Sequence, residues 1–357
     1  MAITMSKLIN LQKISYMKTI FKRILWIAGL LLALGFGVFV YGGLQMFGDE
    51  LRAIRTLKMV KDRVYTFEYK GDYGFKAFLE QGGAKTDEDM AAYIAGFLSK
   101  GYINTGAHTP EAGCSTIASD GLFCRNFDWN SKSHYVIVKT FPDDGYASVS
   151  TTGFAFLGMG EDWHPVAGMD GMTALASIYV PMDGMNEMGV CVSDLVEIDG
   201  SVEIMDTERP DLTIVAAIRL ILDYAKDTDE AVSLLSGYDV FPSVNAAHHL
   251  AISDKNGCNV VVEWHDGEMT VTETDIVTNH CIAEERSSPL TGESRRRFDA
   301  LSQNHSGFTS HAEGLQALKD ASYADYTLWS VIYDKHDLTS TIYFENDWDN
   351  PLTFKIY

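Results

Sequence analysis

The sequence is short of positive charge. It contains 28 Lys and Arg residues against 49 Asp and Glu residues, so its formal net charge is −21 at pH 7. The imbalance lies in one part of the chain, because residues 1–113 carry a formal charge of +4 and residues 114–357 carry −25. A region this acidic repels polyanions, and we therefore expect no nucleic acid among its partners.

Cysteine is scarce as well. The chain has five cysteines, an odd number, and their wide spacing is not that of a disulfide framework. It contains no Cys-x-x-Cys or His-Glu-x-x-His pattern, and neighbours such as His248 and His249 would point to opposite faces of a strand. We therefore expect no metal site and no cofactor, and we interpret Cys191 and Cys281 as packing residues. A papain-like Cys–His site is disfavoured because no histidine lies in an orienting motif.

Charge is absent from one long N-terminal run. Residues 24–48 contain no charged side chain, which exceeds the roughly 20 residues that cross a bilayer as a helix. We expect a basic tail over residues 1–23 and a transmembrane anchor over residues 24–47, with a cleaved signal peptide as the alternative. Basic residues flank the run on both sides. The Lys-rich tail favours a cytoplasmic N-terminus, which would place the rest of the chain outside the cytoplasm.

Regular elements are expected along the remaining chain. Apolar residues at helical spacing predict helices near residues 213–226 and 228–235, and further helices are expected near 87–100, 294–302 and 312–321. Runs of β-prone residues separate them, and the sequence contains no internal repeat or low-complexity tract. Strands interrupted by paired helices indicate an α+β layered fold.

The reactive side chains gather in residues 113–129, which predict a β-hairpin. Asp120-Gly121 separates two apolar, β-prone runs, and this pair tolerates the positive φ angles of a tight turn. Pairing outward from the turn brings Cys114 close to Arg125 and Asp128. A nearby guanidinium favours a thiolate, and a carboxylate can hold a protonated amine. The alternative for any single cysteine is a buried structural role.

These residues resemble a motif of the linear amide C–N hydrolases of the choloylglycine hydrolase and penicillin V acylase superfamily, to which isopenicillin-N acyltransferases and acid ceramidases are related. Cys114-Ser115 is similar to the family's Cys-Thr/Ser opening, and residues 124–128 are similar to its Gly-Arg-Asn-X-Asp motif, with Cys124 in place of the glycine. Other segments resemble later family motifs in the family's order: 184–189, 277–279, 294–301 with Arg297, and 327–334. The resemblance covers residues 64–357.

The resemblance implies an N-terminal nucleophile hydrolase with a four-layer αββα sandwich. It implies cleavage between Gly113 and Cys114, which would separate a pro-segment (48–113) from a catalytic domain (114–357). The Cys114 thiolate would then attack the carbonyl of a small-molecule N-acyl amide and form a thioester that water hydrolyses, with the freed Cys114 amine as base. Gly113 has no Cβ to obstruct the initial attack.

The resemblance also implies roles for four other residues. Arg125 would stabilise the thiolate, Asp128 would hold the Cys114 amine, and Asn279 would donate to the oxyanion. Arg297 would orient Asp128 or neighbouring polar groups. On the residues alone, Asn279 could be a strand cap and Arg297 a solvated charge in a basic run.

One departure concerns the oxyanion hole. Leu195-Val196 stands where related enzymes often carry a Leu-Asn pair, so a backbone N–H would have to replace that Asn, or the chain belongs to a branch without it. An acyltransferase using the same thioester and a catalytically silent, membrane-tethered binding homologue remain as alternatives. Homo-oligomerisation is left open.

Overall fold

The computed structural model describes residues 42, 46–100, 112–166, 169–198, 205–243, 246–283 and 292–357. The chain divides into two compact units, residues 1–51 and 52–357. The predicted tail (1–23) lies outside the described residues, and so does the predicted anchor (24–47) except for residues 42, 46 and 47. Within the described ranges, no helix combines the length and the apolar character that crossing a bilayer requires.

A nine-stranded sheet forms the larger layer of the second unit. Its strand order is β1-β2-β5-β6-β7-β8-β11-β12-β13, and neighbours pair antiparallel except β2 with β5. The strands are β1 (Lys58–Lys61), β2 (Val64–Lys70), β5 (Tyr135–Phe141), β6 (Ser148–Gly153), β7 (Asp183–Asn186), β8 (Cys191–Glu197), β11 (Ala247–Ser253), β12 (Asn259–His265) and β13 (Glu268–Glu273).

A six-stranded antiparallel sheet forms the second layer, in the order β14-β3-β4-β15-β16-β17. Its strands are β14 (Ile276–Thr278), β3 (Ala112–Ala118), β4 (Leu122–Trp129), β15 (Thr327–Asp334), β16 (Thr339–Phe344) and β17 (Leu352–Lys355). The predicted hairpin is confirmed as β3–β4, closed by the Ser119 N–H donating to the Leu122 carbonyl at 2.9 Å. Its register pairs Cys114 with Phe127 and Thr116 with Arg125.

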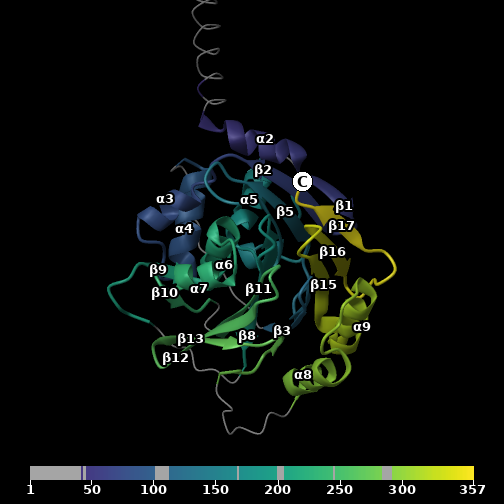
Figure 1. Ribbon diagram of the computed structural model, residues 1–357. Helices are drawn as coiled ribbons and strands as arrows, with labels where there is room; N and C mark the ends of the chain where they lie inside the picture. The colour runs from purple at the N-terminus through teal and green to yellow at the C-terminus, as the bar shows by residue number, and fades with distance from the viewer. Residues whose placement is uncertain are drawn as a thin grey trace, which may run out of the picture. The chain divides into compact units, whose positions relative to one another are not determined.

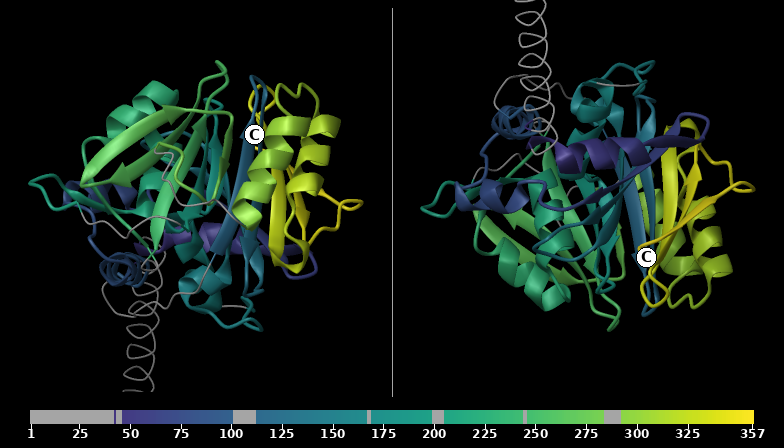
Figure 2. Two further views of the ribbon diagram at one scale, coloured as in Figure 1. Left: turned by 90° about the horizontal axis from the view of Figure 1, so that it is seen from below. Right: turned by 90° about the horizontal axis from the view of Figure 1, so that it is seen from above.

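Helices cover the outer faces of the two sheets, as Figures 1 and 2 show. On the large sheet, α6 (Ile214–Tyr224) lies on β7 and β8, and α7 (Thr228–Leu235) contacts β11 and β12. On the small sheet, α8 (Glu293–Asn304) contacts β14 and β3, and α9 (His311–Ala321) contacts β4 and β15. The other helices are α2 (Gly48–Thr56), α3 (Phe75–Glu80), α4 (Asp87–Leu98) and α5 (Met169–Leu175), and a short parallel pair joins β9 (Asp211–Thr213) and β10 (Asp239–Phe241).

The layer order is therefore helix, sheet, sheet, helix, and the predicted α+β class is confirmed. Strand β4 is buried along its whole length because both of its faces are covered. Its residue Cys124 points at α9, where Gly314 makes room for it: a Cβ at position 314 would lie 2.9 Å from the Cys124 sulfur. A glycine in α9 thus accommodates the residue that departs from the Gly-Arg-Asn-X-Asp pattern.

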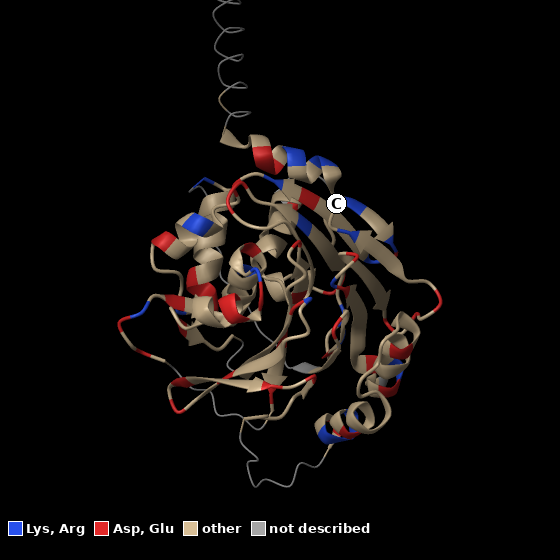
Figure 3. Ribbon diagram, viewed as in Figure 1, with Lys and Arg blue, Asp and Glu red and all other residues tan. Residues whose placement is uncertain are grey.

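Acidic side chains are spread over the helices and loops of the second unit (Figure 3). Residues 114–357 carry a formal charge of −25. The inter-sheet layer, in contrast, contains a few buried charged groups that are described next.

Candidate active site

Cys114 lies near the open end of strand β3 and is 1% exposed. Its sulfur lies 3.4 Å from Nη2 of Arg125 on the neighbouring strand. The register explains this contact, because Cys114 pairs with Phe127 and Arg125 is two residues away on the same strand face. The hairpin alone therefore brings the thiol and the guanidinium together.

Arg125 is completely buried between the two sheets. Its Nη1 donates to Oδ2 of Asp183 at 2.8 Å and to the Met182 carbonyl, and its Nη2 donates to the Asp194 carbonyl as well as to the Cys114 sulfur. Strands β4, β7 and β8 thus fix the guanidinium in one position. A buried cation with these partners is an electrostatic support for a thiolate at Cys114.

Asp183 was not identified from the sequence as a site residue. Its Oδ2 also accepts from the Trp329 indole N–H at 2.9 Å, and its Oδ1 accepts from the Tyr333 hydroxyl at 2.6 Å. Asp183 precedes the family-like segment 184–189, and the two aromatic residues lie within the family-like segment 327–334. Both segments could be found from the sequence. The contacts of Asp183 with Trp329 and Tyr333 could not, because they depend on how the two sheets face each other.

Arg297 points inward from helix α8 and is 1% exposed. Its Nη1 donates to Oδ2 of Asp128 at 2.7 Å and to the Cys114 carbonyl at 2.7 Å. Its Nη2 donates to Oδ1 of Asn279, also at 2.7 Å. The alternative interpretation of Arg297 as a solvated surface charge is therefore wrong.

Asn279 holds the backbone nitrogen of Cys114, whose N–H donates to Oδ1 of Asn279 at 2.7 Å. Because this oxygen accepts from both Cys114 and Arg297, the orientation of the side-chain amide is determined. The Nδ2 group donates to the Val196 carbonyl at 2.7 Å. In this arrangement the Asn279 amide donor is engaged by β8 and does not point to an oxyanion at Cys114.

Asp128 makes contacts that differ from those expected. Its carboxylate accepts from Arg297 and from the Thr327 hydroxyl, the latter at 2.6 Å, while the Cys114 nitrogen is bound to Asn279 instead. The physical reason is that the Cys114 nitrogen of the uncut chain is a peptide N–H with one hydrogen to donate, and Asn279 takes it. The Asn279 side chain, from the strand end after β14, thus stands where Asp128 was expected.

Burial dominates the acid–base properties of the site. It raises the pKa of the Cys114 thiol to about 11, against the opposing effect of the Arg125 guanidinium. It also raises the pKa of the Asp128 carboxyl to about 6, although Arg297 and Thr327 counteract it. With a pKa of about 11, only about one thiol in 10⁴ is ionised at pH 7, so Cys114 requires a base before it can act as a nucleophile.

All five residues singled out from the sequence, Cys114, Arg125, Asp128, Asn279 and Arg297, lie in one connected network. Val196, at the position where the Leu-Asn pair was expected, contributes its carbonyl to Asn279. A second polar group, outside the predicted site, contains Glu197, His265 and Cys281 and has a composition that could hold a metal ion.

Two facing sheets between helix layers, with a buried cysteine at the start of an inner strand, define the fold of the N-terminal nucleophile hydrolases. The model of the family described as acyl-coenzyme A:6-aminopenicillanic acid acyl-transferase matches residues 116–349, and the chain belongs to this family. The match begins two residues after Cys114. The resemblance to the choloylglycine hydrolase and penicillin V acylase superfamily is thereby confirmed.

One solved structure extends this likeness at the level of the fold. The C2A mutant of conjugated bile acid hydrolase from Clostridium perfringens has a TM-score of 0.51 and 13% identity, over 69% of this chain and 92% of that one. Penicillin V acylase from Agrobacterium tumefaciens has a TM-score of 0.46 and 17% identity, over 68% of this chain and 84% of that one. No curated protein sequence matches the chain significantly.

Proposed function

We propose that the chain is a cysteine amidohydrolase that cleaves a linear amide bond of an N-acyl substrate after cutting its own Gly113–Cys114 bond. One observation supports this above all: three different atoms of Cys114 are held by three buried side chains. Arg125 contacts the sulfur, Asn279 accepts from the nitrogen, and Arg297 donates to the carbonyl oxygen. The backbone N–H and C=O of a structural strand cysteine usually pair with neighbouring backbone, whereas here both bind side chains.

The first step is an N-to-S acyl shift within the precursor. The Cys114 sulfur attacks the carbonyl carbon of Gly113, the C–N bond breaks, and the departing nitrogen takes up the proton that the thiol has lost. The resulting thioester reacts with water, which leaves a Gly113 carboxylate and a free amine and thiol on Cys114. The Asn279 oxygen is already placed at the nitrogen that becomes the amine.

The freed amine supplies the base that the buried thiol lacks. An α-amino group has an ordinary pKa near 7.7–8.0, so a sizeable fraction is neutral at physiological pH and can accept the thiol proton. The thiolate attacks the substrate carbonyl beside Arg125, the amine product leaves with a proton, and water hydrolyses the acyl thioester. Asn279 orients the Cys114 amine, and Arg297 orients both Asn279 and Asp128 through its own hydrogen bonds. An oxyanion role for Asn279 would require its amide to leave the Val196 carbonyl.

The substrate class follows from the thioester chemistry and from the relatives. The structural neighbours are named a penicillin V acylase and a conjugated bile acid hydrolase, and the family description names an acyl-transferase. An acyltransferase activity is therefore the second candidate, in which an amine or thiol replaces water as the acceptor of the acyl group.

The proposal is tested by trapping the acyl group. Processed protein is incubated with a panel of N-acyl amides, and intact-mass analysis is used to find a chain whose Cys114 carries the acyl moiety. We expect this adduct and free amine product with at least one amide, and neither with Cys114→Ala. Turnover that persists in Cys114→Ala contradicts the proposal. Added amine or thiol acceptors that divert the acyl group into new amides or thioesters identify a transferase.

The proposal extends to chain organisation and location. Residues 48–113 would be the pro-segment, yet they supply β1 and β2 of the large sheet, so we expect the two fragments to stay together after the cut. The uncharged run 24–48 supports a membrane anchor, and the Lys-rich tail before it supports a catalytic part outside the cytoplasm. When the whole chain is expressed, we expect both fragments in carbonate-washed membranes, with the catalytic part accessible to external protease in intact cells. Release into the soluble fraction contradicts it.

A further inference from the structure

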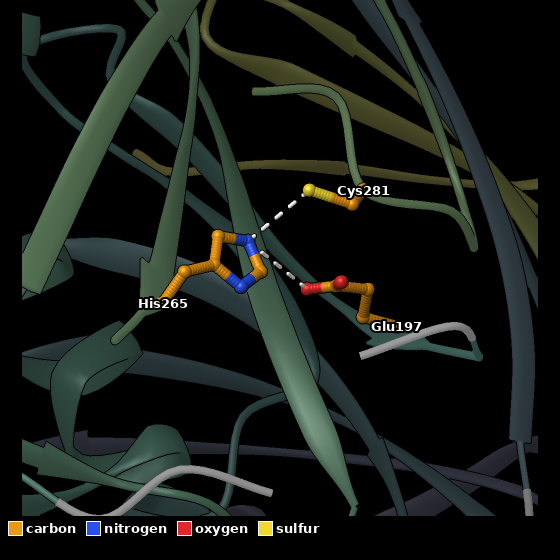
Figure 4. A group of neighbouring side chains, drawn as sticks. All are labelled: Glu197, His265 and Cys281. Atoms are coloured by element: carbon orange, nitrogen blue, oxygen red, sulfur yellow. Dashed lines mark hydrogen bonds and ion pairs between the residues drawn. The ribbon is translucent and has the colours of Figure 1, made fainter. Parts of the chain in front are cut away.

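A second group of reactive side chains lies at one end of the large sheet, outside the Cys114 network. Glu197 ends strand β8, His265 ends β12, and Cys281 follows β14 on the small sheet (Figure 4). Glu197 pairs with Ala247 on the intervening strand β11, and extending the β11–β12 register places Ala247 opposite His265. The small Ala247 side chain leaves room for the two longer side chains to meet above it.

The three side chains converge on one nitrogen atom. Nε2 of His265 lies 3.2 Å from the sulfur of Cys281 and 3.6 Å from Oε2 of Glu197. All three residues are buried, with exposed fractions of 5%, 6% and 3% for His265, Cys281 and Glu197. Cys281 is buried, as its interpretation as a packing residue requires, but its sulfur also faces an imidazole and a carboxylate.

This geometry is not that of a second nucleophile site. In a Cys–His–Glu triad, the carboxylate binds one imidazole nitrogen so that the other can take the thiol proton. Here the sulfur and the carboxylate oxygen approach the same nitrogen, as the two dashed lines from His265 in Figure 4 show. One N–H can point at only one of them, whereas a cation placed between the three atoms would bind all of them.

We propose that Glu197, His265 and Cys281 bind one Zn²⁺ ion. Thiolate, imidazole and carboxylate are the ligands that zinc takes in proteins, in tetrahedral geometry. Bond lengths of about 2.3 Å to sulfur and 2.0–2.2 Å to nitrogen and oxygen place tetrahedral ligands about 3.6 Å (S to N) and about 3.4 Å (N to O) apart. The observed separations of 3.2 and 3.6 Å differ from these by a few tenths of an ångström, and the three ligand atoms all lie within 4.8 Å of one another. Three protein ligands leave one coordination position for a water molecule.

Neighbouring contacts already fix the segment that carries Cys281. Glu263 accepts the backbone N–H groups of Ile282 and Ala283 at 2.8 and 2.7 Å, and its Oε1 contacts Nδ1 of His249 at 3.0 Å. Glu263 and His249 form a second group of potential ligands that shares Glu197 with the first. Metal sites are commonly supported by such surrounding hydrogen bonds, which hold the ligands in place before the ion arrives.

The proposed ion would act on the active site through Asn279. The Asn279 amide donates to the Val196 carbonyl, and the Ile198 N–H donates to the Asn279 carbonyl at 2.8 Å. Glu197 stands between Val196 and Ile198, and Cys281 stands two residues after Asn279. A zinc ion that joins Glu197 to Cys281 therefore ties the Asn279 segment to β8, and it would keep the Asn279 oxygen aligned with the Cys114 nitrogen. Its three ligands are positioning residues.

The test is metal binding by the whole chain in a Cys114→Ala background, which removes the other reactive thiol and any dependence on processing. Metal-free protein is titrated with Zn²⁺, and separately with Co²⁺, whose thiolate charge-transfer absorption reports a sulfur ligand. We expect one Zn²⁺ per chain and this absorption, with binding weakened at least tenfold in Cys281→Ser and His265→Gln. Cys258→Ser is the matched control, because Cys258 lies outside the group, and it should bind as the parent does.

Two results would overturn the inference. One is a correctly folded parent that binds less than a tenth of an equivalent of Zn²⁺. The other is cobalt binding without thiolate absorption, or with absorption that is equally strong in Cys281→Ser. Should the variants fail to fold, the parent alone decides the matter: Zn²⁺ must then slow alkylation of Cys281, located by peptide mapping, and unchanged alkylation refutes the site. None of these readouts requires amidase activity, so failure here is distinct from failure of the proposed function.

Discussion

Replacing Arg297 by glutamine should destabilise the protein far more than its position in a basic run of helix α8 suggests. The substitution removes hydrogen bonds to Asp128, Cys114 and Asn279. Asp128 is only 1% exposed, so its carboxylate would be left buried without a cation. Breaking a buried ion pair typically costs about 3–5 kcal/mol. Arg296→Gln is the matched control: that side chain is 46% exposed and pairs with Glu293 at the surface, so we expect a loss of about 1 kcal/mol or less.

The loss of unfolding free energy caused by Arg297→Gln should also depend on pH. The Asp128 pKa is about 6 in the folded chain and about 3.9 in the unfolded chain, so ionising Asp128 opposes folding by about 3 kcal/mol once the pH exceeds 6. Since Arg297 lowers this pKa, its removal raises it, and the penalty grows by about 1.36 kcal/mol per unit. Near pH 5 folded Asp128 is mostly protonated in both proteins. The difference in free energy of unfolding between the parent and Arg297→Gln is therefore smaller there than at pH 8.

Urea unfolding of uncut Cys114→Ala protein at pH 5 and pH 8 measures these free energies. The double variant Asp128→Asn/Arg297→Gln has no buried charge at these two positions, so at pH 8 it should be more stable than Arg297→Gln alone. The reasoning is refuted if Arg297→Gln costs no more than Arg296→Gln, or if its cost is the same at both pH values.

Two further predictions concern the hairpin. Gly314→Ala places a methyl group 2.9 Å from the Cys124 sulfur and 3.1 Å from the Phe308 ring, and it should lower the free energy of unfolding by about 1–3 kcal/mol. Part of this loss should be recovered in Gly314→Ala/Cys124→Ala. Gly96→Ala, in a helix with open space at its Cβ, should be neutral or stabilising by up to about 1 kcal/mol, and equal losses at both glycines would contradict this explanation. Because the Cys114 pKa is about 11, the thiolate fraction rises about tenfold per pH unit below that value. Self-cleavage of freshly synthesised precursor should therefore accelerate from pH 6 to pH 9, which mass spectrometry over time measures. A flat rate would show that thiol ionisation does not limit the cut.

The local elements could be predicted from the sequence because their signals are local. The Asp120-Gly121 turn between β-prone runs is sufficient for the hairpin and hence for the Cys114–Arg125 contact. The apolar spacing predicted helices near 213–226 and 228–235, and the structure has them at Ile214–Tyr224 and Thr228–Leu235. Arg297 was selected by the family resemblance alone, since a run of three arginines does not reveal which one the helix turns inward.

The long-range contacts of the site could not be predicted, because they depend on how two sheets face each other. Asp183 reaches Arg125 across the inter-sheet layer, and the exchange of expected partners between Asn279 and Asp128 depends on the position of α8. The Glu197–His265–Cys281 group follows no sequence spacing, because its members come from separate strands and one segment that lies opposite them. A search for close-set ligand motifs therefore missed it.

The central claim is that Cys114 becomes the first residue of a new chain and there serves as both nucleophile and base. Intact-mass analysis with N-terminal sequencing of purified, active protein tests it most directly. The account predicts a fragment of residues 114–357 beginning at Cys114, which is absent when Cys114 is replaced by alanine. Amide-cleaving protein in which the Gly113–Cys114 bond is still intact would contradict it.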